Sequence, residues 1–181
     1  VNSALPHKSD HGIVRLNLCD TDDIDGIAQE VLSLGSTALG RPAEDRILIE
    51  QMADGLITEL LIGIQNDPQF GLVMTVAGGG TLVELMADTA TVLLPAQPAD
   101  LFEALSKLRV MPLLQGYRGR PKADVDGLVD TLMSVSTMAL DLAHTLIEMD
   151  INPLWVTEHG SIAVDALIRM GNINALPTAP N

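Results

Sequence analysis

Three side chains near the end of the sequence could hold a metal ion. Glu148, Asp150 and Asn152 alternate with apolar residues before Pro153. In an extended strand, every second side chain points to the same face, so these three should share one face while Met149 and its apolar neighbours take the other. Carboxylate and amide oxygens are the ligands that Mg²⁺ prefers. The spacing therefore predicts a hard-oxygen metal site.

A second strand should follow and add a further carboxylate. We expect a tight turn at His159-Gly160, because glycine supplies the positive φ that a hairpin needs. With a two-residue loop, Glu158 would pair with Ser161. Asp165 would then lie opposite Leu154, on the same face as Asp150 and Asn152. The alternative is that these are solvated polar positions on a hairpin with one wet face, and the pattern alone leaves both interpretations open.

Three other segments carry residues of chemical interest, each with two interpretations. The run 7–12 (HKSDHG) is either an exposed turn or a group serving phosphoryl transfer. The glycines at 78–80 either let the backbone approach a ligand closely or form a flexible turn, and they match no phosphate-loop spacing. The loop 111–124 holds Arg118, Arg120 and Lys122, which either neutralise nearby carboxylates or bind an anion.

The elements that would position these groups follow from apolar periodicity. Three-to-four spacing predicts helices over 24–39, from Pro98 onward, and over 124–144, with caps at Thr21 or Asp22 and at Asp124. Alternating or continuous apolar runs predict strands at 13–18, 46–49, 56–65, 71–77, 81–86 and 91–94. We expect a mixed α and β fold in a single unit, with a small subdomain at 1–49.

Composition narrows the function classes. The 181 residues are 47% hydrophobic, enough for a sizeable core, and only 2% aromatic, which speaks against base stacking. A net charge of −14 would repel nucleic acid, so we expect no nucleic-acid partner. No apolar run is long enough to span a membrane, and no membrane partner is expected. The single Cys19 excludes an internal disulfide and fits a reducing cytoplasm.

A set of short motifs, in order along the chain, carries a family resemblance. They are the runs 6–10 (PHKSD), 59–63 (ELLIG), 67–71 (DPQFG), 79–85 (GGTLVEL), 114–119 (LQGYRG), 150–153 (DINP) and 164–166 (VDA). Together they resemble the ATP-grasp domain of ADP-forming (NDP-forming) acyl-CoA synthetases. The resemblance implies an ATP-grasp fold of the α/β (α+β) class, with a mixed, mainly antiparallel sheet and packed helices.

The resemblance also implies roles for particular residues. Asp150, Asn152 and Asp165 would hold Mg²⁺, with Glu148 a supporting carboxylate. Glu50, Gln51 and Met52 look like the hinge whose backbone meets adenine of ATP or ADP, and Glu59 would be a further nucleotide-binding residue. His7 matches a histidine that serves as a transient phosphoryl carrier in some family members, a role that suits a nucleophilic imidazole.

By the same resemblance, residues 1–49 would be the remainder of the first ATP-grasp subdomain, 50–170 the C-terminal subdomain and 171–181 a loose tail. The sequence begins almost at the first motif, so we expect the N-terminal part of the domain to be missing and the isolated chain to be inactive. The implied reaction is acid, CoA and ATP to acyl-CoA, ADP and phosphate through phosphohistidine.

The implied partners are CoA-binding and CoA-ligase domains or an α subunit, in an oligomeric cytoplasmic enzyme. The alternative function is a non-catalytic, synthetase-like regulatory or assembly module of a protein acetyltransferase. A third interpretation is that the resemblance reports the fold alone.

Overall fold

The computed structural model describes residues 11–19, 21–43, 46–80 and 87–173. The chain divides into two compact units, Val1–Met52 and Ala53–Asn181. His7, the expected strand at 81–86 and residues 174–181 of the expected tail lie outside the described residues. The assignment of 1–49 and 50–170 to two ATP-grasp subdomains stays a prediction.

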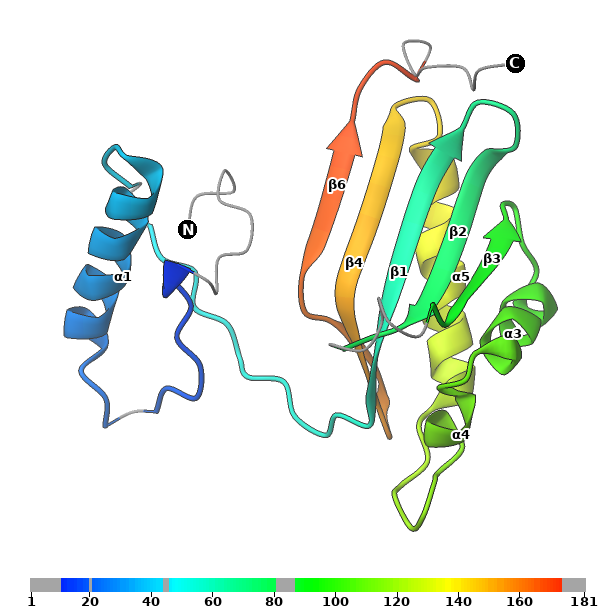
Figure 1. Cartoon of the computed structure of the whole chain (residues 1–181), viewed down its shortest axis with the longest axis horizontal. Coiled ribbons are helices and arrows are strands. Elements are labelled where there is room, and N and C mark those ends of the chain that lie inside the picture. The colour runs from blue at the N-terminus through cyan, green and yellow to red at the C-terminus, as the bar shows by residue number, and fades with distance from the viewer. Residues whose placement is uncertain (1–10, 20, 44–45, 81–86, 174–181) are drawn as a thin grey trace. The chain divides into compact units, whose positions relative to one another are not determined.

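The described residues of the first unit contain one α-helix, α1 (Ile24–Leu39), as the periodicity predicts (Figure 1). The cap residue was predicted wrongly, because Asp23 rather than Thr21 or Asp22 accepts the N–H of Gly26 at 3.0 Å. Asp22 instead accepts the backbone N–H of Cys19 at 2.6 Å, which holds the preceding turn. Gly40 ends the helix at φ +63°, a left-handed conformation that glycine adopts at little cost.

The strands predicted at 13–18 and 46–49 do not form in the structure. Ile13 is buried, but Leu16 and Leu18 are exposed, and so are Leu48 and Ile49. An apolar run becomes a strand only when a neighbouring strand accepts its backbone hydrogen bonds, and the described part of this unit supplies none.

The second unit is built on an antiparallel sheet. Its strands are β1 (Thr58–Asp67), β2 (Gly71–Gly78), β3 (Thr89–Leu93), β4 (Leu146–Thr157), β5 (Gly160–Ala163) and β6 (Ala166–Met170). Their order is β3-β2-β1-β4-β5, and β6 also pairs with β4. Every pairing between them is antiparallel. The mixed α and β, mainly antiparallel architecture expected from the sequence is therefore confirmed.

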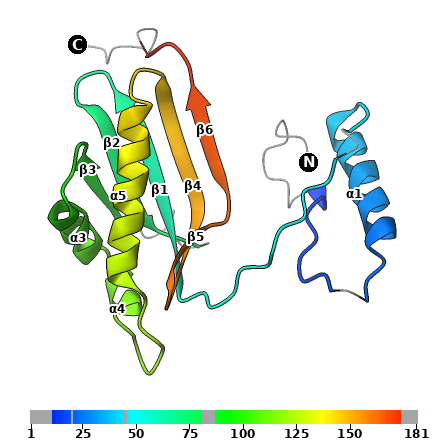
Figure 2. The ribbon, with the colours of Figure 1, turned by 180° about the vertical axis from the view of Figure 1, so that it is seen from behind.

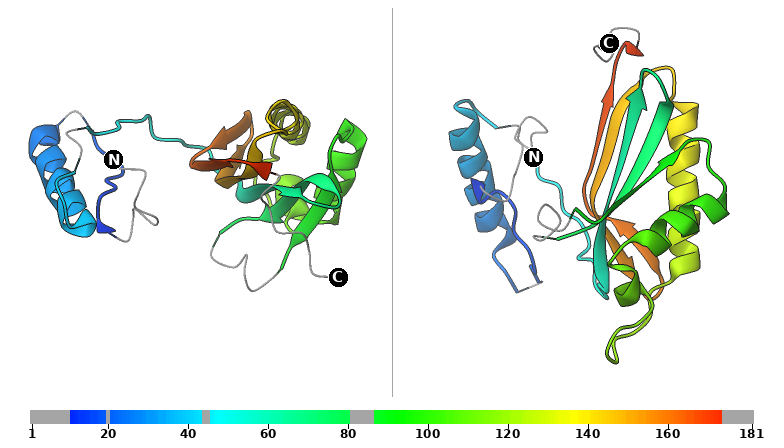
Figure 3. Two further views of the ribbon diagram at one scale, coloured as in Figure 1. Left: turned by 90° about the horizontal axis from the view of Figure 1, so that it is seen from above. Right: turned by 45° about the vertical axis from the view of Figure 1, so that its right-hand side comes forward.

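The helices of this unit lie on one face of the sheet, as the views from behind and from above show (Figures 2 and 3). They are α3 (Pro98–Lys107), α4 (Met111–Leu114) and α5 (Val125–Asp141). No described helix of this unit covers the opposite face, which we call the open face. Among the described residues, no helix is long and apolar enough to cross a membrane.

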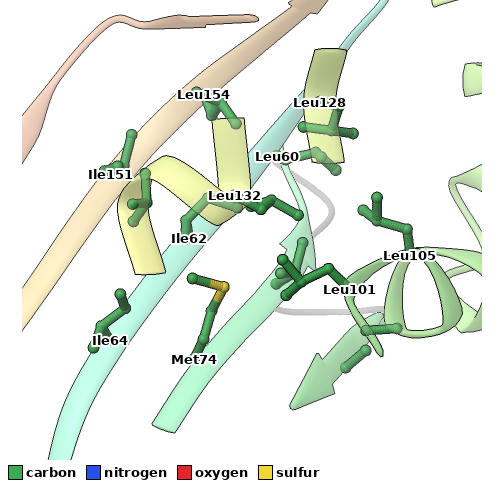
Figure 4. Packing of buried hydrophobic residues seen from close by; sticks show 14 of the residues in the cluster. Leu60, Ile62, Ile64, Met74, Leu101, Leu105, Leu128, Leu132, Ile151 and Leu154 are labelled. Carbon is green, nitrogen blue, oxygen red and sulfur yellow. The ribbon is translucent and has the colours of Figure 1, made fainter. Parts of the chain in front are cut away.

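Period-two alternation in the strands explains the core. In β1, Leu60, Ile62 and Ile64 are at most 1% exposed and meet α5 through Leu128 and Leu132 (Figure 4). The residues between them point to the open face. Paired residues of β1 and β2 therefore lie either both in the core or both on the open face.

Helix α5 begins as predicted and ends earlier than predicted. Asp124 accepts the N–H of Gly127 at 2.9 Å and caps the first turn. The helix stops at Asp141 rather than near His144. Beyond it, the Asn66 side-chain amide donates to the carbonyls of Ala143 and Leu146, at 3.0 and 3.2 Å, and so holds the turn that leads into β4.

Candidate functional site

Strand β4 carries two of the three predicted metal-binding residues, Asp150 and Asn152, and it contains an irregularity at the second of them. Leu60 pairs with Leu154 and Ile62 with Ile151, so two residues of β4, Asn152 and Pro153, stand against Leu61. Such a bulge adds one residue to the alternation. Before it Ile151 is buried, and after it Leu154 is buried. The bulge therefore lets both halves of β4 contribute to the same core.

The β4–β5 hairpin differs from the prediction by its register. Thr157 pairs with Gly160, so Glu158 and His159 form the turn and Gly160 begins β5. The Thr157 hydroxyl fixes this turn, because it accepts the N–H of His159 at 3.1 Å and donates to the carbonyl of Gly160 at 3.0 Å. The predicted Glu158–Ser161 pair is therefore wrong.

This register brings Asp165 directly opposite Asn152 rather than opposite Leu154. The backbone N–H of Asn152 donates to the carbonyl of Asp165 at 3.1 Å. Residues that stand opposite each other share a face of the sheet. The partner of Asp165 on β4 therefore lies two positions from the one the sequence predicted, and Asp165 and Asn152 are direct neighbours across the strands.

Asp150 is the electrostatic centre of this cluster. Burial raises the pKa of the Asp150 carboxyl, and the negative charges of Glu148 and Asp165 raise it further. Its Oδ1 atom is buried and receives no hydrogen bond from the described residues. An acceptor oxygen that is withdrawn from water without a partner is costly for a fold. A bound cation would supply the partner that this oxygen lacks.

The side-chain oxygens of Asp150, Asp165 and Asn152 fit Mg²⁺ as part of its ligand shell rather than as the whole of it. Among the described residues, no three His, Cys, Asp or Glu side chains are grouped closely enough to hold a metal by themselves. Mg²⁺ is commonly held by one or two carboxylates, with water and substrate phosphate completing its shell. Asp150 and Asp165, with the Asn152 amide, match that pattern. The strand partner of Asp150 on its other side is Gly63, which has no side chain to crowd it.

Glu148 is engaged elsewhere, as a supporting carboxylate would be. Arg169 of β6, its strand partner, contacts both of its carboxylate oxygens, at 2.9 and 3.0 Å. A bidentate guanidinium pair of this kind fixes both side chains in one geometry. Glu148 therefore adds negative charge near Asp150 but offers its oxygens to Arg169.

Glu59 lies on the open face at the start of β1, directly opposite Trp155 of β4. The Trp155 indole N–H donates to Glu59 Oε1 at 3.1 Å. The glycine run passes close by, because Gly79 donates its N–H to the carbonyl of Glu59 at 2.7 Å. Gly79 approaches the backbone of Glu59 rather than a ligand, so both interpretations of these glycines stay predictions. Sequence reasoning missed the Trp155 contact, since it depends on the register between strands far apart in the sequence.

The remaining predicted nucleotide-binding residues are not brought into a site by the described structure. Glu50, Gln51 and Met52 are exposed, lie in neither helix nor strand, and end the first compact unit. His7 lies outside the described residues. In the basic loop, the Arg118 guanidinium stacks 5.1 Å from the ring centre of Tyr117, and both interpretations of that loop stay open.

Comparison with known proteins assigns the family. A profile of the ATP-grasp domain matches residues 1–170. The chain is 33% identical to ADP-forming acetate–CoA ligase I of Archaeoglobus fulgidus, over 94% of this chain and 24% of the relative. It is 32% identical to the β subunit of ADP-forming acetate–CoA ligase II of Pyrococcus furiosus, over 90% of this chain and 69% of the relative. It thus spans about a quarter of the single-chain ligase and two thirds of the β subunit.

Solved structures agree with the sequence relatives. The dinucleotide-forming acetyl-coenzyme A synthetase 1 of Korarchaeum cryptofilum, in complex with coenzyme A and Mg-AMPPCP, superposes with a TM-score of 0.81 at 28% identity, over 94% of this chain and 74% of that one. The same protein with coenzyme A and Ca-AMPCP gives a TM-score of 0.84 at 27% identity, over 93% and 72%. Both are bound to a nucleotide analogue and a divalent cation.

Proposed function

Because this chain belongs to the ATP-grasp domain family, and to the branch of it found in ADP-forming acetate–CoA ligase β subunits, we propose that it is the nucleotide- and Mg²⁺-binding portion of an ADP-forming acyl-CoA synthetase. The enzyme would be an acid–thiol ligase that joins an acid to CoA while ATP becomes ADP and phosphate. The observation that carries the proposal is the unpartnered Asp150 oxygen on the open face beside Asp165 and Asn152.

Each residue of the cluster would have a distinct part in holding the metal. Asp150 and Asp165 would supply carboxylate oxygens, and Asn152 a neutral amide oxygen. These residues would hold Mg²⁺, whose positive charge would stabilise the negative charge that develops during phosphoryl transfer. Glu148, tied to Arg169, would add negative charge without occupying a ligand position.

The nucleotide and the phosphoryl group would meet the predicted residues outside the metal cluster. We include Glu59 as a nucleotide contact, since it lies on the open face of the sheet that carries Asp150. Glu50, Gln51 and Met52 would contact adenine through their backbone. His7 would carry the phosphoryl group transiently. The Korarchaeum enzyme, whose phosphohistidine segment points towards the nucleotide site in one complex, supports this part of the proposal.

The proposed partners are CoA-binding and CoA-ligase domains or an α subunit, because two curated relatives are β subunits. An oligomeric enzyme in the cytoplasm belongs to the same proposal, and the free, exposed Cys19 is consistent with a reducing compartment. The alternative of a non-catalytic module gains no support from the cluster, since all three predicted metal ligands are present.

Nucleotide binding tests the proposal directly. We expect the full-length natural protein to bind ADP in a Mg²⁺-dependent manner in calorimetry. Replacing Asp150 and Asp165 together by Ala should weaken that binding by about tenfold or more, since charge-assisted contacts are lost. The control replaces two exposed carboxylates away from the cluster, Asp141 and Glu158, and should change little. Absence of binding, or equal binding by both variants, would reject the proposal.

A further inference from the structure

Trp155 is the only tryptophan of the sequence. Its indole N–H is directed at the carboxylate of Glu59. It is half-buried on β4, opposite Glu59, and its indole N–H donates to Glu59 Oε1 at 3.1 Å. A hydrogen bond to a carboxylate is shorter and stronger than one between neutral groups. A buried indole N–H usually finds an acceptor, so the bond by itself does not distinguish a packing role from a positioning role.

The main chain of Glu59 is held in place by contacts other than the indole hydrogen bond. Gly79 donates to its carbonyl at 2.7 Å, and a Cβ on Gly79 would stand 2.6 Å from that same carbonyl group. Real Cβ atoms do not approach so closely, so only glycine permits this crossing. The backbone of Glu59 is therefore fixed from one side by the glycine run and from the other by the β1–β4 ladder.

The two oxygens of Glu59 are in different situations. Oε1 accepts the indole N–H, which has a single hydrogen to give. Oε2 lies 3.7 Å from the place where a Cβ of Gly80 would be, and receives no hydrogen bond from the described residues. A glutamate side chain with three rotatable bonds loses much entropy when it is fixed in one rotamer. The indole bond selects one such rotamer in advance and leaves Oε2 available.

We propose that Trp155 is a positioning residue for nucleotide binding: its indole N–H holds Glu59 so that Oε2 meets a hydrogen-bond donor of the nucleotide. The inference rests on the proposed function, because it takes the ligand to be the nucleotide. Trp155 itself need not touch that ligand. Its effect is to remove from the binding step the cost of ordering Glu59.

The competing explanation is that the Trp155 ring only packs on its neighbours. Ile162 of β5 stands opposite Trp155 and is 41% exposed, so the ring does have an apolar companion. Packing and positioning differ in one respect. A packing role is independent of the Glu59 carboxylate, whereas a positioning role disappears when that carboxylate is removed.

A double-mutant cycle measured by calorimetry with Mg-ADP separates the two explanations. In the full-length natural protein, we expect Trp155→Phe to weaken binding about fivefold to tenfold, because Phe keeps the ring and loses the N–H. In a Glu59→Ala background, the same change should alter the affinity less than about twofold. The matched control, Ile162→Val, trims the apolar companion of Trp155 and should leave the affinity unchanged. Circular dichroism should show that each variant is folded, and Trp155→Leu, which also lacks a side-chain donor, replaces Trp155→Phe if the latter is not.

Equal losses from Trp155→Phe in both backgrounds, or no loss in either, would overturn the positioning role while leaving the proposed function intact. A wild-type protein that binds no Mg-ADP would overturn the proposed function, and this inference with it.

Discussion

At the scale of single residues, the Asp150 carboxyl works against the stability of the metal-free fold. Its pKa is raised, first by burial and then by Glu148 and Asp165, so the folded chain binds a proton more tightly there than the unfolded chain does. Near neutral pH the group is charged in a place that disfavours charge. Residues that bind ligands are often a cost to the empty protein in this way.

We expect Asp150→Asn to raise the midpoint of thermal unfolding of the metal-free protein, by about 2 °C at pH 7.5. The effect is kept small because solvent partly screens the repulsion. In the wild type, lowering the pH towards the raised pKa should give a similar gain as the carboxyl takes up its proton, and this pH dependence should weaken in the variant. Calorimetric scans from pH 8 down to the ordinary pKa of an aspartate, about 4, measure both. An unchanged or lower midpoint would show that Asp150 is not destabilising.

The same titration predicts how Mg²⁺ affinity depends on pH. A carboxyl must lose its proton to bind a metal, so a raised pKa brings proton competition closer to neutral pH. Mg²⁺ dependence of ADP binding should therefore weaken as the pH falls towards the raised pKa of Asp150, and Asp150→Asn should have weak Mg²⁺ dependence throughout. Calorimetric titrations at several pH values supply the test, and a flat profile in the wild type would argue against Asp150 as a ligand.

Gly79 offers a residue-scale prediction about stability. Gly79→Ala should destabilise the second unit by about 1–3 kcal/mol, because the new Cβ would stand 2.6 Å from the Glu59 carbonyl. The matched control is Gly63→Ala in the middle of β1, where the nearest atom to a Cβ is Leu61 Cδ2 at 3.9 Å. Urea unfolding compares the two variants. Similar midpoints for both would contradict the close crossing seen here.

At the scale of elements, apolar periodicity in the sequence correctly predicted those helices and strands whose formation depends on the local sequence pattern. Helix α1 and the start of α5 follow from apolar spacing and from a capping aspartate, and β1 and β2 follow from alternation. The strand predicted at 13–18 did not form, because a strand depends on a partner that local pattern does not show. The face shared by Glu148 and Asp150 was predictable, whereas the pairing of Asp165 was not, because one hydroxyl at Thr157 decides the register.

The cap of α5 is the element-scale prediction. Asp124→Ala should cost about 1 kcal/mol of unfolding free energy, since the N–H of Gly127 loses its acceptor. Asp124→Asn keeps a capping oxygen and should cost much less. Chemical denaturation of the two variants gives the comparison, and an equal loss for both would assign the effect to charge at the helix end rather than to the cap.

At the scale of the whole molecule, the segment that follows Arg46 contains the boundary between the two compact units, which falls between Met52 and Ala53. Residues 46–56 form neither helix nor strand, and Leu48 and Ile49 are 66% and 80% exposed. The first backbone bond that ties this segment to the sheet is from Ile57 to Val156, at 2.9 Å. The sequence predicted a polar hinge at 50–55 and a strand beginning at 56, close to this limit.

Limited proteolysis should therefore cut within 47–56 before it cuts in the described residues 57–80 and 87–173, because exposed backbone without hydrogen-bond partners fits a protease site. The expected product is a stable fragment that begins near Ala53, identified by mass spectrometry. Saturation with Mg-ADP in a parallel digestion shows whether ligand slows the cut. Primary cleavage inside the sheet would contradict the division into these units.

The pairing of β4 with β5 limits where residues can be inserted or deleted in this hairpin. Asp165 faces Asn152 only because the residues from Thr157 back to Pro153 are matched one for one by those from Gly160 to Val164. Inserting or deleting one residue within either run would turn Asp165 to the opposite face of the sheet. Changes at the tip, Glu158 and His159, would leave the pairing intact. Natural variants of this chain should therefore gain or lose residues at the tip and keep the two matched runs at constant length.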